Sequence, residues 1–573
     1  MKELFLGNEA VARGLYEAGC RVVSSYPGTP STEVTEYAAE YDEIYCEWAP
    51  NEKVAMEVAG GASISGARAF CGMKHVGLNV AADPLFTLSY TGVNAGLVIV
   101  VADDPGMHSS QNEQDSRHYA LASKTMMFEP ADSDECLQYT KLAFELSEQF
   151  DTPVIIRLTT RIAHSRSIVN TGERIDLGVK EYIKNPQKYV MMPAMAKTRH
   201  ELVEKRVLAQ TEWAETSAIN KTEYNSTKIG VITSGACYQY AKEALGDKAS
   251  YLKLGCVYPL PVELIKNFSA KCDKVYVVEE LDDYIEAHCL KNGIVVIGKE
   301  AFTLLGEYSQ SLVSKVILGE TKSSLSADVI TPNRPPVLCA GCPHRGLFYS
   351  LKKLKTFVSG DIGCYTLAAL QPLGMMDTCI CMGASVSMLH GRNKADEANA
   401  KKSVAVIGDS TFIHSGVTGL IDIAYNKSDS VVIILDNSIT GMTGHQQNPT
   451  TGKTIKGDPA AAVDLEMLAK AVGIERVVVV DPNNLDATEK AIKAELEADG
   501  PSVVISRRPC ALLKYVKHSA PLQVDREKCT SCKMCMRIGC PSLSFKEGKA
   551  SINKTQCVGC GVCTQLCKFD AIS

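Results

Sequence analysis

Short runs of consecutive apolar residues, rich in valine and isoleucine, recur along the chain and are separated by segments long enough to form helices. Runs of this length and composition predict strands that are buried on both faces, as in parallel sheets covered by helices. The pattern therefore predicts an α/β fold with several doubly wound parallel-sheet domains. The predicted strands are residues 96–102, 152–158, 228–235, 274–280, 403–409, 430–437 and 476–481.

Three stretches interrupt this alternation. Residues 183–227 are polar and short of strands, and an exposed helix is predicted within them at 201–215. Residues 319–336 are rich in serine and proline, which indicates a linker. Residues 514–527 lead into a cysteine-rich tail with α+β character. We therefore predict four domains, which span residues 1–190, 225–318, 335–512 and 520–573.

Composition narrows the class of protein. The net charge of −6 argues against nucleic-acid binding. The amino terminus lacks the pattern of a signal peptide, and no apolar run reaches the ~18 residues of a membrane span. We therefore expect a cytoplasmic protein without membrane contact. The chain has 22 cysteines, and in a reducing compartment the 14 that lie outside the tail are expected to be free thiols.

Two cysteine runs lie in the tail, and their C-x2-C-x2-C spacing is typical of [4Fe–4S] ligation. In two-cluster ferredoxins the fourth cysteine of each run serves the other cluster, and the same crossing is expected here. A hairpin that turns at Glu547-Gly548 is predicted between the runs. A zinc site or a disulfide knot is the structural alternative. The expected ligands are Cys529, Cys532, Cys535 and Cys567 for one cluster, and Cys557, Cys560, Cys563 and Cys540 for the other.

The tail departs from the bacterial ferredoxin pattern at two points. Four residues, rather than three, precede Cys540, and Lys568 stands where a proline usually follows the last cysteine. Neither change removes a ligand.

Two predicted strands in the third domain end in polar residues. One ends in Gly408-Asp409-Ser410, and the next ends in Asp436-Asn437-Ser438. The carboxylate of Asp409, the amide oxygen of Asn437 and a backbone carbonyl, for which Ile439 is the candidate, would suit Mg²⁺ that bridges a diphosphate. A simple turn after each strand is the alternative.

The spacing resembles the thiamine diphosphate motif, G-D-G followed by N-N, with Ser410 and Asp436 as departures. That cofactor also needs a glutamate that contacts its pyrimidine ring. The segment 49–69 resembles the element that supplies this glutamate, so Glu52 is the candidate and Glu57 the alternative. An ordinary first-turn helix carboxylate would also explain Glu52.

Over almost its whole length the chain resembles the 2-oxoacid:ferredoxin oxidoreductases, and among them most the alpha subunits that oxidise indolepyruvate. The resemblance implies that arylpyruvates (indolepyruvate, phenylpyruvate and 4-hydroxyphenylpyruvate), coenzyme A and oxidised ferredoxin give aryl-acetyl-CoA, CO₂ and reduced ferredoxin. It also implies a separate beta subunit in an α2β2 assembly, and a transketolase-C-like second domain. The motifs that carry it are residues 25–34, 51–69, 103–117, 339–348, 360–367, 408–416 and 435–449, with the C-terminal cysteines.

The resemblance also suggests contacts with the cofactor. Cys342 and His344, in the loop that begins at Cys339, would lie near the diphosphate and thiazolium, although zinc or structural roles are alternatives. The remaining candidates are Gly363, Cys364 and Met382, for each of which ordinary packing is the alternative.

Candidates for the substrate are fewer. Thr29 lies in a Pro-Gly-Thr-Pro loop, and Arg117 has the guanidinium fork that matches a carboxylate. A turn and a surface arginine are the respective alternatives. His75 is a weaker candidate for a proton donor.

Three other functions remain open at this point. The first is the same chemistry on pyruvate or 2-oxoglutarate, the second a decarboxylase with vestigial clusters, and the third an electron-transfer subunit without a substrate site. The complete set of eight tail cysteines counts against the second, and Glu52, Asp409 and Asn437 together count against the third.

Overall fold

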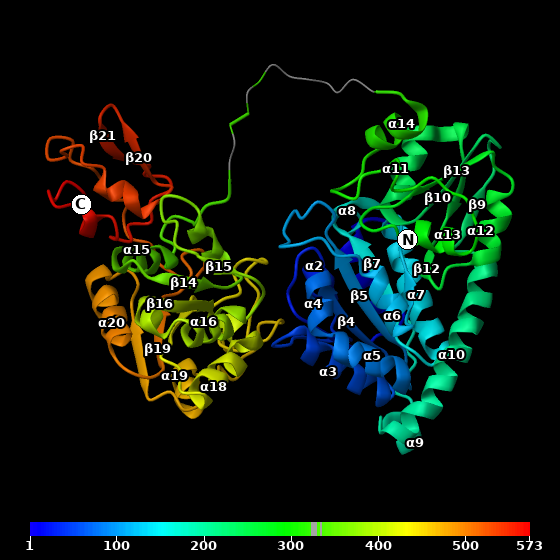
Figure 1. Cartoon of the computed structure of the whole chain (residues 1–573), viewed down its shortest axis with the longest axis horizontal. Helices are drawn as coiled ribbons and strands as arrows, with labels where there is room; N and C mark the ends of the chain where they lie inside the picture. The colour runs from blue at the N-terminus through cyan, green and yellow to red at the C-terminus, as the bar shows by residue number, and fades with distance from the viewer. Residues whose placement is uncertain (322–328, 330, 333–334) are drawn as a thin grey trace. The chain divides into compact units, whose positions relative to one another are not determined.

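The computed structural model describes residues 1–321, 329, 331–332 and 335–573, which fall into two compact units, Met1–Asp328 and Val329–Ser573 (Figure 1). Most of the predicted linker at 319–336 lies outside the described residues. Among the helices of the described residues, none combines the length and the apolar character that crossing a membrane requires.

The first unit is built on a seven-stranded sheet in the order β12-β6-β7-β5-β4-β2-β3. All neighbours are parallel except β12 and β6. Every residue of β4, β5 and β7 is buried, as expected when helices cover both faces. The strands are β2 (Val22–Ser25), β3 (Tyr45–Trp48), β4 (Ala69–Lys74), β5 (Leu97–Asp103), β6 (Met126–Phe128), β7 (Val154–Thr159) and β12 (Cys256–Tyr258).

Helices surround this sheet, and a short antiparallel pair, β1 (Lys2–Leu6) with β8 (Arg166–Asn170), lies beside them. The helices are α1 (Gly7–Glu17), α2 (Thr32–Ala38), α3 (Glu52–Ile64), α4 (His75–Val80), α5 (Ala82–Thr91), α6 (Arg117–Ser123), α7 (Ser133–Phe150) and α8 (Thr160–His164).

A second sheet in the same unit has the order β13-β10-β11-β9, with only β9 antiparallel. Strand β12 follows this sheet's β11 in the chain but pairs with β6 of the seven-stranded sheet, so the two sheets share one unit. The predicted domain boundaries stay predictions. The elements are β9 (Lys221–Glu223), β10 (Ile229–Thr233), β11 (Ser250–Lys253), β13 (Lys274–Val278), α11 (Gly235–Leu245), α12 (Val262–Ser269), α13 (Tyr284–Lys291) and α14 (Gln310–Leu318).

The helix predicted at 201–215 is present as α10 (Pro193–Thr216), after the single turn α9 (Pro186–Tyr189), but it is not exposed on all sides. Arg199 donates to the carbonyl of Tyr90 at 2.6 Å, and Arg206 donates to that of Ser89 at 3.0 Å. The sequence predicted an exposed helix because charged residues, among them these two buried arginines, occupy its inner face as well as its outer face.

The second unit contains a six-stranded, fully parallel sheet in the order β15-β14-β16-β17-β19-β18. Apolar clusters cover both faces of this sheet. The strands are β14 (Phe357–Gly360), β15 (Thr378–Cys379), β16 (Ser403–Gly408), β17 (Val431–Asp436), β18 (Arg476–Val480) and β19 (Ser502–Arg507), and the helices are α15 (His344–Leu354), α16 (Ala384–Ala395), α17 (Asp409–Thr411), α18 (Val417–Tyr425), α19 (Leu465–Ala471) and α20 (Leu485–Glu497).

The cysteine-rich tail packs on this second sheet domain. The predicted hairpin is confirmed as β20 (Leu543–Lys546) and β21 (Lys549–Ile552), with positive φ at Glu547 and Gly548 in its turn. Residues of the tail, including Ile538 and Leu566, belong to the same apolar cluster as Leu347 of α15. The short turns η5 (Met534–Ile538) and η6 (Thr564–Leu566) complete the tail.

All seven predicted strands are confirmed, with ends that shift by one or two residues, and so is the α/β class with a ferredoxin-like tail. Both large sheets also have a topological switch point, where the connections from two adjacent strands leave in opposite directions. It lies between β2 and β4 in the first unit and between β14 and β16 in the second. Ligands of open parallel sheets bind at the carboxyl ends of such strands.

Candidate functional site

Glu52 begins α3 beside the first switch point. The side chain of Asn51 caps the helix by accepting a hydrogen bond from the Val54 amide at 2.9 Å. The Glu52 side chain is buried, and its Oε1 would lie 2.5 Å from a Cβ placed on Gly77. A glycine at 77 in α4 therefore lets the carboxylate lie directly against that helix.

Thr29 follows β2, one of the two strands that form this switch point. The Ser109 hydroxyl donates to its carbonyl oxygen at 3.4 Å. The adjacent Gly28 lies against Lys74, which ends β4: a Cβ on Gly28 would be 3.0 Å from that of Lys74. His75 follows Lys74 and is fully buried, and burial lowers its pKa. Among the described residues its ring nitrogens make no hydrogen bond of ordinary geometry.

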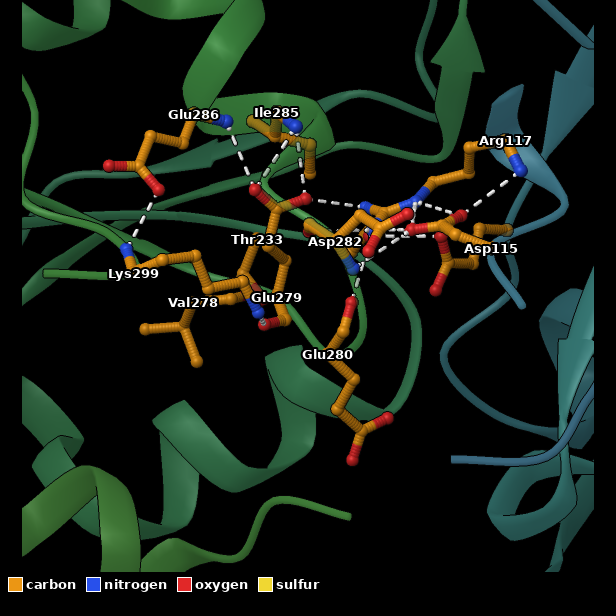
Figure 2. A network of polar contacts seen from close by, with 12 residues as sticks. Asp115, Arg117, Thr233, Val278, Glu279, Glu280, Asp282, Ile285, Glu286 and Lys299 are labelled. Carbon is orange, nitrogen blue, oxygen red and sulfur yellow. Dashed lines mark hydrogen bonds and ion pairs between the residues drawn. The ribbon is translucent and has the colours of Figure 1, made fainter. Parts of the chain in front are cut away.

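Arg117 lies in a buried network that joins the two sheets of the first unit (Figure 2). Its Nε donates to Asp115 at 2.8 Å, and its Nη1 donates to Glu279 at 2.6 Å. Burial alone would raise the pKa of Asp115, but Arg117 and Arg157 hold it below its ordinary value. The predicted contact between Arg117 and a substrate carboxylate stays a prediction, because the guanidinium already has a carboxylate on each side.

Asp409 lies at the second switch point, directly after Gly408 at the end of β16. Its Oδ1 accepts a hydrogen bond from the Ser410 amide at 2.7 Å, and its buried Oδ2 makes no hydrogen bond of ordinary geometry among the described residues, although the nearby amides of Ser438 and Ile439 favour the charged carboxylate. Burial, reinforced by the nearby Asp436 carboxylate, raises the pKa of Asp409 to about 7. A buried carboxylate oxygen without a partner is costly unless a cation completes it.

Asn437 follows β17 at the same edge of the sheet. It is 8% exposed, and its Oδ1 accepts from the Ile439 amide at 3.3 Å. The neighbouring Asp436 forms an ion pair with Arg507, with 2.8 Å between Asp436 Oδ2 and Arg507 Nε. The residues therefore fit a divalent cation held by Asp409, Asn437 and the Ile439 carbonyl, since oxygen ligands with few protein contacts suit Mg²⁺.

The loop after β14 lies against the same edge. The Tyr365 hydroxyl accepts from the Gly408 amide at 2.9 Å and donates to the Ile362 carbonyl at 3.0 Å. A Cβ on Gly363 would meet the Tyr365 ring at 2.4 Å, so a glycine is needed there. His344 begins α15, contacts the Tyr365 ring edge-on at 5.8 Å, and has a pKa lowered by burial to about 4.

Met382 lies just before the amino terminus of α16. It precedes Gly383, where α16 is capped, and the Ser415 hydroxyl donates to its carbonyl at 2.9 Å. Asp361, which sequence reasoning missed, holds this turn by accepting hydrogen bonds from the amides of Gly383 and Ser385, each at 2.9 Å.

A fourth cysteine, Cys510, joins the three that the sequence singled out. Its amide donates to the Asn437 carbonyl at 2.9 Å, and Cys364 Sγ would lie 3.4 Å from a Cβ on Gly441 in the same loop. Burial raises the pKa of Cys364 to about 11, and the Cys510 and Cys339 thiols add to the rise. Cys342 similarly interacts with Cys339 and Cys364. Four grouped thiols are the ligand type that binds iron–sulfur clusters.

The eight tail cysteines surround two cavities, and each cavity matches one predicted crossed set. Arg345 fixes the tail to the sheet domain by donating to the carbonyls of Ile538 at 3.2 Å and Gly539 at 2.5 Å. The cavity that contains Cys540 is also lined by Cys342. One cavity is lined by Cys529, Cys532, Cys535 and Cys567, and the other by Cys540, Cys557, Cys560 and Cys563.

Three known families match consecutive parts of the chain. Residues 13–230 match the family described as pyruvate flavodoxin/ferredoxin oxidoreductase, thiamine diphosphate-binding. Residues 361–506 match the C-terminal binding domain of thiamine pyrophosphate enzymes, and residues 550–573 match the 4Fe-4S binding domain.

Several full-length relatives are named indolepyruvate oxidoreductase subunit IorA. The chain is 40% identical to that subunit of Archaeoglobus fulgidus, over 100% of this chain and 97% of the relative. It is 40% identical to that of Methanothermobacter marburgensis, over 99% and 96%, and 39% identical to that of Pyrococcus horikoshii, over 100% and 96%.

Proposed function

Because the chain belongs to the IorA subunits of the thiamine diphosphate-dependent 2-oxoacid:ferredoxin oxidoreductases, we propose that it oxidises arylpyruvates such as indolepyruvate, phenylpyruvate and 4-hydroxyphenylpyruvate. An arylpyruvate and coenzyme A give aryl-acetyl-CoA and CO₂. The two electrons released by this oxidation are transferred to ferredoxin one at a time. The observation that carries the proposal is that the loop after Asn437, at the same sheet edge as Asp409, lies directly beside a set of four cysteines.

Thiamine diphosphate, when bound, supplies the electron sink for loss of CO₂. Asp409, Asn437 and the Ile439 carbonyl would hold its Mg²⁺, and the buried Oδ2 of Asp409, which makes no hydrogen bond of ordinary geometry among the described residues, supports this assignment. Glu52 would hold and move the proton of the pyrimidine ring, because a buried glutamate at a helix amino terminus has a fixed orientation. His344 is held neutral by burial and would contact the cofactor without adding charge.

The cysteines would carry the electrons away. The two cavities of the tail fit the two predicted [4Fe–4S] clusters. Cys339, Cys342, Cys364 and Cys510 fit a third, which the sequence had not suggested. Cys342 also lines the tail cavity that contains Cys540. The three cysteine sets would therefore form a continuous path for electrons from the loop after Asn437 to the tail.

Partners follow from the same reaction. We propose a beta subunit in an α2β2 assembly, ferredoxin as the acceptor, and coenzyme A as co-substrate. The relatives' name describes a subunit, which supports a second chain.

The test is identification of the product. The chain, co-purified anaerobically with its beta subunit, is incubated with indolepyruvate, coenzyme A and oxidised ferredoxin, and thioesters are identified by mass spectrometry. Indoleacetyl-CoA formed together with reduced ferredoxin supports the proposal. Free indoleacetaldehyde without ferredoxin reduction would contradict it.

A further inference from the structure

We propose that Lys74 binds the carboxylate of the 2-oxo acid. This inference deepens the proposed function and rests on it. Lys74 is the last residue of β4, at the topological switch point of the first sheet. The strand on the other side of that point is β2, which leads to the Thr29 loop.

The Lys74 ammonium is buried, and among the described residues no carboxylate lies within ion-pair distance of it. The residue is 7% exposed, and its Nζ donates to the Ser109 carbonyl at 2.6 Å and to the Ser109 hydroxyl at 3.4 Å. Both of these acceptors are uncharged. In the part of the chain that the structure describes, Asp104 acts on Lys74 as a charge but does not accept a hydrogen bond from it.

Asp104 is already occupied by other donors. Its Oδ2 accepts from the Ser109 amide at 2.8 Å and the Ser110 hydroxyl at 2.6 Å, and its Oδ1 accepts from the Thr160 hydroxyl at 2.7 Å. Burial lowers the pKa of Lys74 to about 8, so the ammonium keeps its charge at neutral pH. An uncompensated buried charge is expensive, and an anionic ligand would offset that cost.

The surroundings indicate which anion this is. Gly28 of the Thr29 loop packs on the Lys74 side chain, and Ser109 bridges Lys74 to the Thr29 carbonyl. On the other side, α4 begins directly after Lys74, and its Gly77 contacts the Glu52 carboxylate. Lys74 thus lies between the loop proposed for the substrate and the glutamate proposed for the cofactor. A small carboxylate is the charged group that every 2-oxo acid brings to this place.

The proposal predicts selectivity for acids over neutral analogues. A charge-assisted hydrogen bond contributes about 1.5–3 kcal/mol, so its loss should weaken carboxylate binding about 10- to 100-fold. The affinity for an arylacetaldehyde, which lacks the carboxylate, should not change. The KM for coenzyme A should also stay unchanged.

The test uses the complete complex with Lys74→Gln, Lys74→Arg, and Lys141→Gln as a control that removes a partly exposed, ion-paired lysine of the same unit. Cluster absorbance and thiamine diphosphate content establish that each variant is intact. The binding readout, which needs no turnover, is the Kd of 3-phenylpropionate against that of the neutral 3-phenylpropionamide. The kinetic readout is the KM for phenylpyruvate and for coenzyme A.

We expect Lys74→Gln to weaken phenylpropionate about 10- to 100-fold, with the amide unchanged, and Lys74→Arg to recover part of the loss. Equal weakening of acid and amide, or a rise confined to the KM for coenzyme A, would overturn the proposal. If Lys74→Gln does not fold, an intact Lys74→Arg variant that binds the acid more weakly and the amide unchanged supports the proposal, and one that weakens both equally overturns it. A wild-type complex that binds phenylpropionate selectively but oxidises no 2-oxo acid would contradict the proposed function and leave Lys74 as an anion site.

Discussion

The backbone amide of Cys510 donates a hydrogen bond of 2.9 Å to the carbonyl oxygen of Asn437. This contact links the loop that we assign to Mg²⁺ with a cysteine that we assign to an iron–sulfur cluster. Because the two residues follow neighbouring strands, β19 and β17, the sheet itself fixes the relation between them.

Substitution of Cys510 by serine should remove one cluster and leave the cofactor in place. Iron should fall from about 12 to about 8 atoms per chain, at four iron atoms per cluster. Anaerobic iron analysis, with thiamine diphosphate measured in the same sample, is the readout. Cys272→Ser, in the other unit, is the control. An unchanged iron content in the Cys510 variant would contradict a third cluster.

Asp409→Asn should abolish retention of Mg²⁺ and thiamine diphosphate, because an amide replaces the carboxylate whose buried Oδ2 makes no hydrogen bond of ordinary geometry among the described residues. The visible absorbance of the clusters should persist. Cofactor content after gel filtration is the measurement, and Asp422→Asn on the exposed side of α18 is the matched control. Stoichiometric cofactor in the Asp409 variant would show that the metal ligands lie elsewhere.

Glu52→Gln should slow cluster reduction by a 2-oxo acid about 100-fold, in line with the loss of a proton-transfer group. Cofactor content should change less than two-fold. Glu57→Gln, in the same helix but exposed, provides the comparison and tests the alternative that the sequence left open. A larger rate loss in the Glu57 variant would reverse the assignment.

The crossed assignment in the tail predicts which variants resemble one another. Cys540→Ala and Cys560→Ala should remove the same component of the reduced protein's electron paramagnetic resonance spectrum, because both line one cavity. Cys535→Ala should remove a different component. If the Cys540 variant matched the Cys535 variant instead, the crossing would be wrong.

Glu280 should make stability depend on pH. Burial raises its pKa to about 7 from the ordinary 4.5, so between these values the folded chain holds a proton that the unfolded chain releases. Stability therefore falls as pH rises through this window. Glu280→Gln removes the penalty and should stabilise the protein by roughly 1–3 kcal/mol at pH 8, with little effect at pH 4.5.

The measurement for Glu280 is the thermal unfolding midpoint of variant and wild type at both pH values. The Glu280 carboxylate accepts a hydrogen bond from the Tyr308 amide at 2.7 Å. A glutamine at this position keeps an oxygen that can accept the same bond. Glu263→Gln, an exposed substitution in the same unit, is the control. A gain that is the same at pH 4.5 and pH 8 would show that titration of Glu280 is not the cause.

Elements defined by local pattern could be predicted from the sequence. The strand β17, for example, is a continuous β-branched run, and such a run is stable only when buried on both faces. The start of α3 at Glu52 could also be predicted, because asparagine, here Asn51, is a favoured residue at the N-cap position of a helix. The position of Asp409 at a strand end follows from the same local signals.

Relations between distant segments could not be predicted. Cys510 is a single cysteine in its segment, and only the pairing of β19 with β17 brings it to Asn437. Arg117 gave no sign that Glu279, 162 residues away, would bind it. Lys74 carried no local signal of burial, because its surroundings come from the separate segments of Gly28 and Ser109 that contact it.

The most direct test of the central claim is anaerobic stopped-flow absorbance of the complex with its beta subunit. Indolepyruvate, phenylpyruvate, pyruvate and 2-oxoglutarate are each mixed with the oxidised protein, with and without coenzyme A. We predict that the arylpyruvates bleach the cluster absorbance and that Asp409→Asn abolishes the bleaching. Protein that contains thiamine diphosphate and all its clusters, but is bleached by none of the acids, would contradict the link between the Asp409 site and the cysteine sets.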